Sequence, residues 1–250
     1  MNHYRCRLDW GRRGAAHAAR RGDILVIVDV LSFSSAVVTA VECGASIRPA
    51  ADEEDALKLL QGFPNAVVAR RREAARDRLQ SNTFSLSPTS FFGITTGTHV
   101  ILPSPNGAAC SKLAGDSPVV AGCLLNAHSA AHRAMLLAEE RGRDITVLAC
   151  GERFDDQSAD GTLRFAIEDY LGAGAILSEI TVAPTPEAEL CRIAFSAAVN
   201  EGRLDPLIRE SISGIELRDR GYLSDVLHAL KHNTCLSAPV LRAGWYLNAE

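Results

Sequence analysis

The chain has 250 residues, enough for one large domain or two small ones with a sizeable core. Hydrophobic residues make up 47% and charged residues 22%, as in ordinary globular proteins, and the formal net charge is -4 at pH 7. Proteins that bind nucleic acids are usually more basic, so we expect no nucleic-acid partner. The basic run Arg70, Arg71 and Arg72 is followed by Glu73 and Asp77, which predicts a solvated surface of mixed charge.

The cysteines and the apolar runs indicate the cellular compartment. The seven cysteines are scattered, with no CxxC pair and no other zinc-type spacing, as expected of reduced thiols in the cytoplasm. The N-terminal segment lacks the apolar stretch of a signal peptide, and no apolar run approaches the ~20 residues that span a membrane. The sequence therefore predicts a soluble cytoplasmic protein without membrane contacts.

The first half of the chain alternates strand and helix patterns. Residues 24–30 (ILVIVDV) are a β-branched run without alternation, typical of a strand covered on both faces. Residues 34–45 have helical spacing that stops near Gly44, a suitable C-terminal glycine. Residues 52–62 predict a second helix and residues 65–70 a second strand. Residues 81–97 are rich in Ser, Thr, Phe, Pro and Gly, which predicts a long ordered loop of functional interest.

The same alternation continues in the second half. Strands are predicted at residues 99–102, 117–122 and 143–150, and helices at about 126–142 and 162–171. The last third, from Ala175 onward, is mostly helical in pattern. We therefore predict an α/β fold with a mainly parallel sheet flanked by helices and a helical C-terminal third. Residues 1–250 show no internal boundary or repeat, so we expect a single domain.

Three polar segments directly follow predicted strands, where ligands collect in open parallel sheets. They are the turn at Asp29, the Ser-Pro-Asn-Gly turn at residues 104–107, and the segment beginning at Gly151. The last is rich in carboxylates, which suit Mg²⁺, although solvated acidic residues before a helix give the same pattern. Its charged residues are Glu152, Arg153, Asp155, Asp156, Asp160, Arg164, Glu168 and Asp169.

The spacing within these segments suggests further roles. Asp160, Arg164 and Glu168 follow one another at intervals of four and are expected on one helix face. The Ser-Pro-Asn-Gly turn fits simple turn chemistry, yet it also offers Ser104, Asn106 and backbone N–H groups to an anion. The turn has no Gly-Lys-Ser/Thr ending, so it is not a Walker A loop, and a nucleotide enzyme is disfavoured.

Five motifs occur in order along the chain: DVLSFSSAVVTAVECGA, SLSP, LPSPNGA, AGCLLNA and GERF followed by DGTLRFAIEDYLGAGAI. Together they resemble the 2-phosphosulfolactate phosphatase family over about residues 22–245. The resemblance implies an α/β fold unlike that of the common phosphatases. It also implies a Mg²⁺-dependent phosphatase that converts 2-phospho-3-sulfolactate to 3-sulfolactate and phosphate, a step of coenzyme M biosynthesis.

The resemblance also assigns residues. Its acidic positions fall on Asp29, Glu42, Glu152, Asp160, Glu168 and Asp169. From these we assign Mg²⁺ to Asp29, Glu152, Asp160 and Asp169. Catalysis is assigned to Asp29, Glu42, Glu168 and Arg164, with Glu168 or Glu42 as general acid or base. Substrate binding is assigned to Ser32, Ser104, Asn106, Gly107, Asn126 and Arg164.

Several alternatives remain open at this stage. Many relatives have an arginine where this chain has Ser32, and an arginine there would suit a phosphate or sulfonate, so the substrate could be another small phosphorylated acid. Asp29 could act as a covalent nucleophile, although the DxD pattern is missing because residue 31 is Leu. A non-catalytic anion-binding relic is a further possibility. A homodimer is the default expectation for the assembly.

Overall fold

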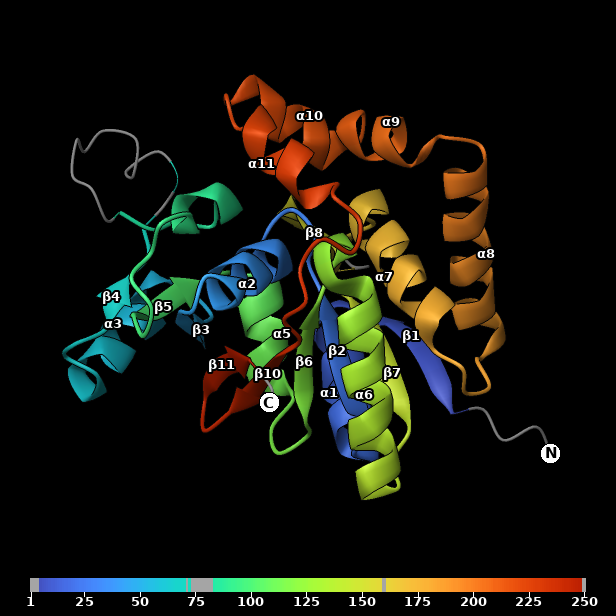
Figure 1. Ribbon diagram of the computed structural model, residues 1–250, viewed down its shortest axis with the longest axis horizontal. Coiled ribbons are helices and arrows are strands. Elements are labelled where there is room, and N and C mark those ends of the chain that lie inside the picture. The colour runs from blue at the N-terminus through green and yellow to red at the C-terminus, as the bar shows by residue number, and fades with distance from the viewer. Residues whose placement is uncertain (1–4, 71, 73–82, 159–160, 249–250) are drawn as a thin grey trace.

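A mixed β-sheet forms the centre of the computed structural model, which describes residues 5–70, 72, 83–158 and 161–248, with backbone alone at 155–158 and 161 (Figure 1). Within these residues the sheet has nine strands in the order β1-β7-β2-β6-β10-β11-β3-β5-β4. The strands are β1 Cys6–Trp10, β2 Ile24–Val28, β3 Ser46–Ala50, β4 Val67–Val68, β5 His99–Pro103, β6 Val119–Gly122, β7 Ile145–Ala149, β10 Pro239–Arg242 and β11 Trp245–Asn248.

Helices cover both faces of this sheet. The α-helices are α1 Gly11–Arg21, α2 Phe33–Glu42, α3 Glu53–Gly62, α5 Gly107–Leu113, α6 Ala127–Arg141, α7 Ile167–Glu179, α8 Pro186–Asn200, α9 Leu204–Arg209, α10 Ile212–Asp219 and α11 Leu223–Ala229, with short 3-10 turns η1 Pro88–Phe91 and η2 Leu124–Asn126. Strand β2 shows how the sheet is covered on both faces, because its side chains alternate between two hydrophobic cores, one on each face. Val26 packs with α6 and α7, and Leu25 and Ile27 pack with α1, α2 and α5.

The strand directions divide the sheet into two parallel blocks. Strands β1, β7, β2 and β6 are parallel to one another, as are β3, β5 and β4. The antiparallel hairpin β10–β11 joins the blocks, pairing with β6 and with β3 through one residue pair each. The predicted mainly parallel α/β sheet is confirmed. The narrow junctions and the twist of roughly 20–25° per strand prevent the blocks from forming one flat surface.

The predicted helices at 34–45, 52–62 and 126–142 and the strands at 24–30, 99–102, 117–122 and 143–150 are confirmed as α2, α3, α6, β2, β5, β6 and β7. The strand predicted at 65–70 is the two-residue edge strand β4. The helical last third is confirmed in α8 to α11, which lie along the top and right of Figure 1. The final hairpin β10–β11, however, belongs to the middle of the sheet.

The helix predicted at about 162–171 is wrong in its first half. Residues 161–164 form strand β9 Gly161–Arg164, which pairs with β8 Glu152–Ser158 as a separate two-stranded sheet, and α7 begins at Ile167. The sequence Thr-Leu-Arg-Phe at 162–165 has the two-residue alternation of a strand. Asp160 lies outside the described residues, and Arg164 and Glu168 do not share a helix face.

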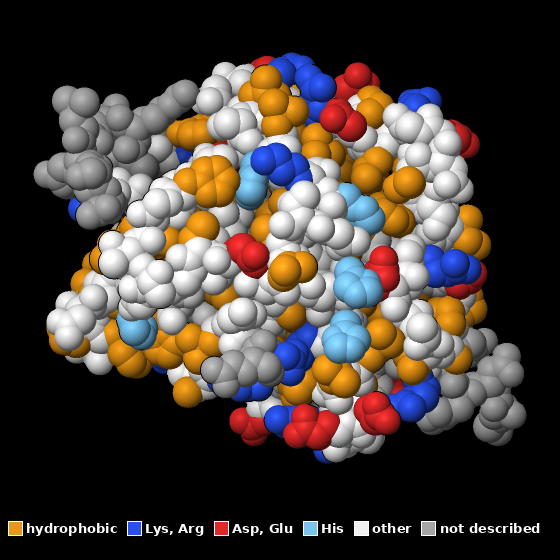
Figure 2. Space-filling model, in the orientation of Figure 1, with side chains coloured by type: hydrophobic (Ala, Val, Ile, Leu, Met, Phe, Trp, Pro, Cys, Tyr) orange, Lys and Arg blue, Asp and Glu red, His pale blue; other side chains and the backbone are white. Residues whose placement is uncertain are grey.

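The surface mixes charged and apolar side chains. On the face shown in Figure 2, the Lys and Arg side chains of the described residues are interspersed with Asp, Glu and apolar side chains. The expectation that the arginine run is solvated holds for Arg70, which is exposed, and is wrong for Arg72, whose side chain is 11% exposed. Arg71, Glu73 and Asp77 lie outside the described residues. No helix among the described residues has the length and apolarity to cross a membrane.

Candidate active site

Asp29 lies directly after β2, where the chain turns into α2. Its Oδ1 accepts a hydrogen bond from the Phe33 backbone N–H (3.0 Å), and its Oδ2 accepts one from the Gly107 N–H (2.9 Å). The carboxylate is buried, and burial is the main reason that its pKa rises to about 6, with the charges of Glu152 and Glu168 adding to the rise. Asp29 therefore joins the ends of β2 and β5 and is held in one orientation.

The Ser-Pro-Asn-Gly turn after β5 connects Asp29 to the next acidic residue. The Asn106 side-chain Nδ2 donates to Glu152 Oε1 (2.9 Å), and the Asn106 backbone N–H donates to Ser104 Oγ (3.3 Å). A Cβ atom on Gly107 would lie 2.3 Å from the Phe33 ring, so only glycine fits there. The N–H groups of Asn106 and Gly107 are thus used within the protein, and the turn acts mainly through its side chains.

Two buried carboxylates in the first turn of α7 complete the cluster. Asp169 accepts the Val30 N–H on Oδ1 (2.7 Å) and the Gly151 N–H on Oδ2 (2.9 Å), which ties the ends of β2 and β7 together. Burial raises the pKa of Asp169 well above its usual value, and the charges of Asp29 and Glu168 raise it further. Burial also raises the pKa of Glu168, against hydrogen bonds from hydroxyls of α10 and its N-cap. Four acidic side chains therefore converge: Asp29, Glu152, Glu168 and Asp169.

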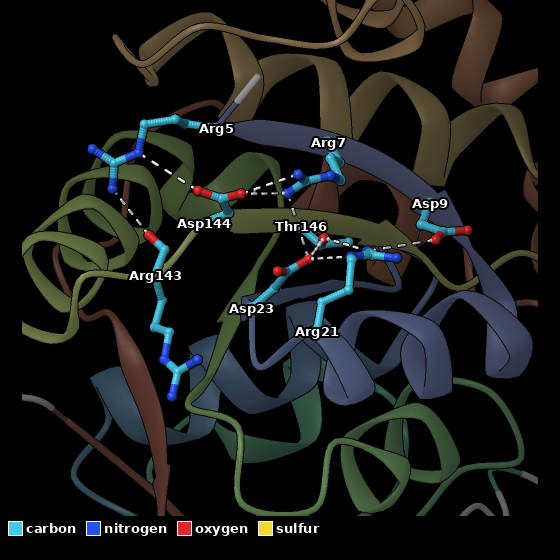
Figure 3. A network of polar contacts seen from close by, with 8 residues as sticks. All are labelled: Arg5, Arg7, Asp9, Arg21, Asp23, Arg143, Asp144 and Thr146. Carbon is cyan, nitrogen blue, oxygen red and sulfur yellow. Dashed lines mark hydrogen bonds and ion pairs between the residues drawn. The ribbon is translucent and has the colours of Figure 1, made fainter. Parts of the chain in front are cut away.

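Charges at the amino ends of the strands are arranged differently. In the network of Figure 3, Arg7 Nη1 lies 3.0 Å from Asp144 Oδ2, and Arg21 Nε lies 2.9 Å from Asp23 Oδ2, so each aspartate is neutralised by an arginine. Among the ion pairs of the described residues, none involves the four acidic side chains of the candidate site. Only hydrogen bonds stabilise their charge within the described residues, and a buried carboxylate without an ion-pair partner is costly unless a cation or a proton is present.

The structure does not bring every predicted site residue to this cluster. Glu42 is exposed at the far end of α2, about 15 Å along the helix axis from its start, and accepts the Ser237 N–H (2.8 Å). Asn126 is fully buried, with its amide bonded to the Cys123 N–H and to the carbonyls of Ala121 and Ser237. Both residues hold the fold together, and their predicted catalytic and substrate-binding roles gain no support from the geometry.

Arg164 also differs from its expected placement. It ends strand β9, and its Nη2 lies 3.9 Å from Glu216 Oε1 on α10. The side chain is 14% exposed. Because it lies near Glu216, this arginine links the β8–β9 hairpin to α10 in the helical C-terminal region. Its predicted contact with a substrate phosphate remains a prediction.

The side chain of Ser32 contacts Arg72, an arginine that the sequence motifs do not predict as a site residue. The Arg72 Nη2 donates to Ser32 Oγ and to the Leu86 carbonyl (3.0 Å), and the Arg72 Nε lies 3.3 Å from Asp225 Oδ2. A guanidinium from a distant part of the chain thus lies against the hydroxyl of Ser32. Asp225 also accepts hydrogen bonds from the hydroxyls of Ser87 (2.6 Å) and Thr89 (2.9 Å), two residues of the predicted functional loop at 81–97.

Two arginine-containing cavities lie on either side of the Ser-Pro-Asn-Gly turn. One, of about 430 Å³, is lined by Asn106 and by Arg12, Arg13 and Arg153, together with Trp10 and Leu163. The other, of about 400 Å³, is lined by Ser104 and by Arg70, Arg72 and Arg220. Cavities of this size hold small ligands, and arginines are the side chains that best recognise phosphate, sulfonate and carboxylate groups. The site therefore suits a small molecule with more than one anionic group.

The raised pKa of Asp29 predicts a specific pH dependence of stability. The folded protein keeps this proton up to about pH 6, whereas in the unfolded chain the pKa is near 3.8. Burying the protonated Asp29 carboxyl therefore stabilises the folded protein. This stabilisation is complete when the pH is below the pKa of the unfolded chain, and it is lost as the pH rises through about 6. Urea unfolding of wild type and Asp29→Asn with EDTA, from about pH 4 to 7, should show a difference in unfolding free energy that changes by on the order of 2 kcal/mol. Parallel curves for the two proteins would contradict the burial of this charge.

Comparisons with known proteins place the chain in a family. The model of the 2-phosphosulpholactate phosphatase family matches residues 13–244. A protein of Pseudothermotoga lettingae named probable 2-phosphosulfolactate phosphatase is 27% identical over 207 residues, which cover 81% of this chain and 82% of the relative. The 2-phosphosulfolactate phosphatase of Methanothermobacter thermautotrophicus is 26% identical, with 88% of each chain covered. A probable 2-phosphosulfolactate phosphatase of Deinococcus radiodurans is 27% identical, with 89% of each covered. On the match over residues 13–244, this chain belongs to the 2-phosphosulfolactate phosphatase family.

Proposed function

We propose that the protein is a Mg²⁺-dependent phosphatase that releases phosphate from a small phosphorylated acid, with 2-phospho-3-sulfolactate as the preferred substrate. The observation that carries this proposal is the convergence of four acidic side chains next to a turn flanked by two arginine-lined cavities. The phosphatase names of relatives that match over most of the chain support the same reaction. The product, 3-sulfolactate, would then serve coenzyme M biosynthesis or a related use.

The acidic side chains fit a Mg²⁺ ion. Asp29, Glu168 and Asp169 are buried, and their pKa values are raised by burial and by one another's charges, so a divalent cation would relieve the repulsion. The described residues contain no group of three or more His, Cys, Asp or Glu side chains placed to hold a metal by themselves. Mg²⁺ commonly uses one or two carboxylates together with water and substrate phosphate. Asp29, Asp169 and Glu152 are the residues that we propose to hold it.

The roles of the protein residues follow from their contacts. When bound, Mg²⁺ would neutralise phosphate charge and favour ionised water. Glu168 is the best-placed general base, because burial raises the pKa of its carboxylate and α10 orients it, whereas Glu42 lies elsewhere. Asn106 fixes Glu152 through its amide, and the arginines on either side of the turn would position the substrate anions. The chemistry is then mostly positioning and charge stabilisation.

The backbone contacts of Asp29 bear on the covalent alternative. Both of its carboxylate oxygens already accept backbone N–H groups, which lowers their nucleophilicity and suits a fixed ligand better than an attacking group. Direct hydrolysis by water is therefore the mechanism that we favour. A phosphorylated Asp29, trapped by acid quenching and detected by mass spectrometry, would support the covalent route instead.

A substrate panel tests the proposed function. Phosphate release should be measured from 2-phospho-3-sulfolactate, 2-phospholactate and phosphoglycolate, each with Mg²⁺ and with EDTA. We expect Mg²⁺-dependent release that is fastest with the sulfonate, and complete loss of activity in EDTA that added Mg²⁺ restores. Faster release from another phosphorylated acid would support the proposed reaction and would show that 2-phospho-3-sulfolactate is not the preferred substrate. Absence of release from every compound would favour the non-catalytic anion-binding alternative.

A further inference from the structure

The cavity on the Ser104 side of the turn has a guanidinium at its inner end. Its positively charged lining residues are Arg70, Arg72 and Arg220, and Leu86, Pro103 and Pro105 add apolar walls. Asp52 and Glu53 also line it, and Asp52 is engaged as the N-cap of α3, where its Oδ1 accepts the Asp55 N–H (2.8 Å). Arg70 and Arg220 are exposed, whereas the side chain of Arg72 is 11% exposed. The cavity thus combines one fixed arginine with two at its rim.

Arg72 is held rigidly from three sides. Its Nε pairs with Asp225, which is 1% exposed, and its Nη2 donates to Ser32 Oγ and to the Leu86 carbonyl. Its guanidinium carbon lies 5.4 Å from the centroid of the Tyr222 ring, a cation–π contact. Of the hydrogen bonds among the described residues, none uses Nη1, so its two N–H groups are available to a ligand. A preorganised fork with free donors is what a fixed oxyanion site requires.

The electrostatic surroundings of Arg72 also favour an anion. Burial is the largest influence that lowers the pKa of Arg72, Asp225 opposes it, and the like charge of Arg220 lowers it again. A bound anion between the guanidinium groups would relieve both the desolvation and the repulsion.

Two residues connect this cavity to the acidic cluster. Ser32 immediately precedes Phe33, whose N–H binds Asp29 Oδ1, so Arg72 reaches the same turn that holds Asp29. Ser104, which lines the cavity, begins the turn whose Gly107 N–H binds Asp29 Oδ2. A small substrate held at the acidic cluster by its phosphate could therefore extend a second group toward Arg72.

We propose that the cavity of Arg70, Arg72, Ser104 and Arg220 binds the anionic group of the substrate that is not transferred, and that Arg72 determines specificity for it. This inference rests on the proposed phosphatase function, because it assigns the second half of the same substrate. The group recognised is an oxyanion on the carbon skeleton, either a sulfonate or a carboxylate. Asp225, Ser87 and Thr89 are positioning residues that hold the guanidinium in place.

The test uses Arg72→Lys, which keeps a positive charge beside Asp225 and loses the second pair of N–H donors. KM and kcat should be measured with 2-phospho-3-sulfolactate, with 2-phospholactate, which has only the carboxylate, and with O-phosphoisethionate, which has only the sulfonate. We expect KM to rise on the order of 10- to 100-fold for each substrate whose anion the cavity holds, with little change in kcat. Phenyl phosphate, which lacks a second anion, should show the smallest change in KM between the two proteins. A higher KM for 2-phospholactate would identify the carboxylate as the group that the cavity binds, and a higher KM for O-phosphoisethionate would identify the sulfonate.

Binding of 3-sulfolactate separates this inference from the proposed function. Calorimetric titration with 3-sulfolactate requires no turnover, so it remains informative if the protein releases no phosphate. We expect wild type and the control Arg192→Met, which removes an exposed i,i+3 pair with Glu189, to bind it alike, and Arg72→Lys to bind it on the order of 10-fold more weakly or worse. Equal binding by Arg72→Lys and wild type, or no binding by wild type, would overturn the inference. If wild type hydrolyses every substrate and Arg72→Lys alters neither KM nor kcat for any of them, the inference is overturned and the phosphatase function still holds.

Discussion

Replacing Asp29 with asparagine is expected to lower kcat for phosphate release by on the order of 10³-fold or more, the range found when a central catalytic group is removed. The substitution keeps the shape of the side chain and removes the charge that would hold Mg²⁺. One of the two backbone N–H groups that bind Asp29 would then face an amide NH₂, at a cost of about 1–3 kcal/mol. That cost leaves the protein folded, because burial of the neutral side chain offsets part of it. Circular dichroism and phosphate release would measure the two effects separately.

The matched control for this prediction is Asp116→Asn. Asp116 is an exposed aspartate just before the amino end of β6, whereas Asp29 follows the carboxyl end of β2. Its substitution should leave both kcat and the unfolding transition unchanged. Wild-type activity in Asp29→Asn would exclude Asp29 from the chemistry and would move the site away from the end of β2.

Replacing Gly107 with alanine is expected to disable the enzyme through the backbone. The added Cβ would lie 2.3 Å from the Phe33 ring, so either the turn or the start of α2 must shift. Such overpacking costs roughly 1–3 kcal/mol of stability, and the shift breaks the hydrogen bond from the Gly107 N–H to Asp29. We expect kcat to fall by on the order of 10²-fold, because a misplacement of about 1 Å has that effect.

Gly62→Ala is the control for this second prediction. Gly62 ends α3, and a Cβ there would meet nothing within 4 Å. This variant should retain wild-type kcat and an unchanged or slightly higher unfolding midpoint, since alanine is the better helix former. Gly107→Ala with normal activity would show that the turn does not position Asp29.

The sequence was sufficient for the elements whose patterns are local. Strand β2 and helices α2, α3 and α6 follow from runs and periodicities within 5 to 15 residues. The hairpin β10–β11 is harder to predict, because its two-residue turn needs positive φ at both Ala243 and Gly244, and alanine rarely adopts that conformation. The acidic run at 152–160 favours a loop and a helix start, and it hides strand β9 Gly161–Arg164. The exposed Leu163 and Phe165, in alternation, were the signal for a strand.

The candidate site was only partly predictable for a physical reason. Asp29, Asn106 and Glu152 follow strand ends, so the topology of a parallel sheet was enough to bring them together. The pair of Arg72 and Asp225 joins residues 153 positions apart, and no local spacing indicates such a contact. The motif SLSP at 85–88 was the available clue, since its Ser87 and Leu86 contact the two partners. Burial, which raises the pKa values of Glu168 and Asp169, likewise depends on tertiary packing and not on charge pattern.

A crystal structure of the protein with Mg²⁺ and 3-sulfolactate tests the central claim most directly. We expect the metal beside Asp29 and Asp169, and the sulfolactate in the cavity of Ser104 and Arg72 with an oxyanion on Arg72 Nη1. The molecule also has an arginine-containing cavity of about 530 Å³ near the amino end of β6, lined by Arg20, Arg141 and Arg143 among other residues. Sulfolactate bound in the cavity of Arg20, Arg141 and Arg143, with the acidic cluster free of metal, would contradict the placement of the active site.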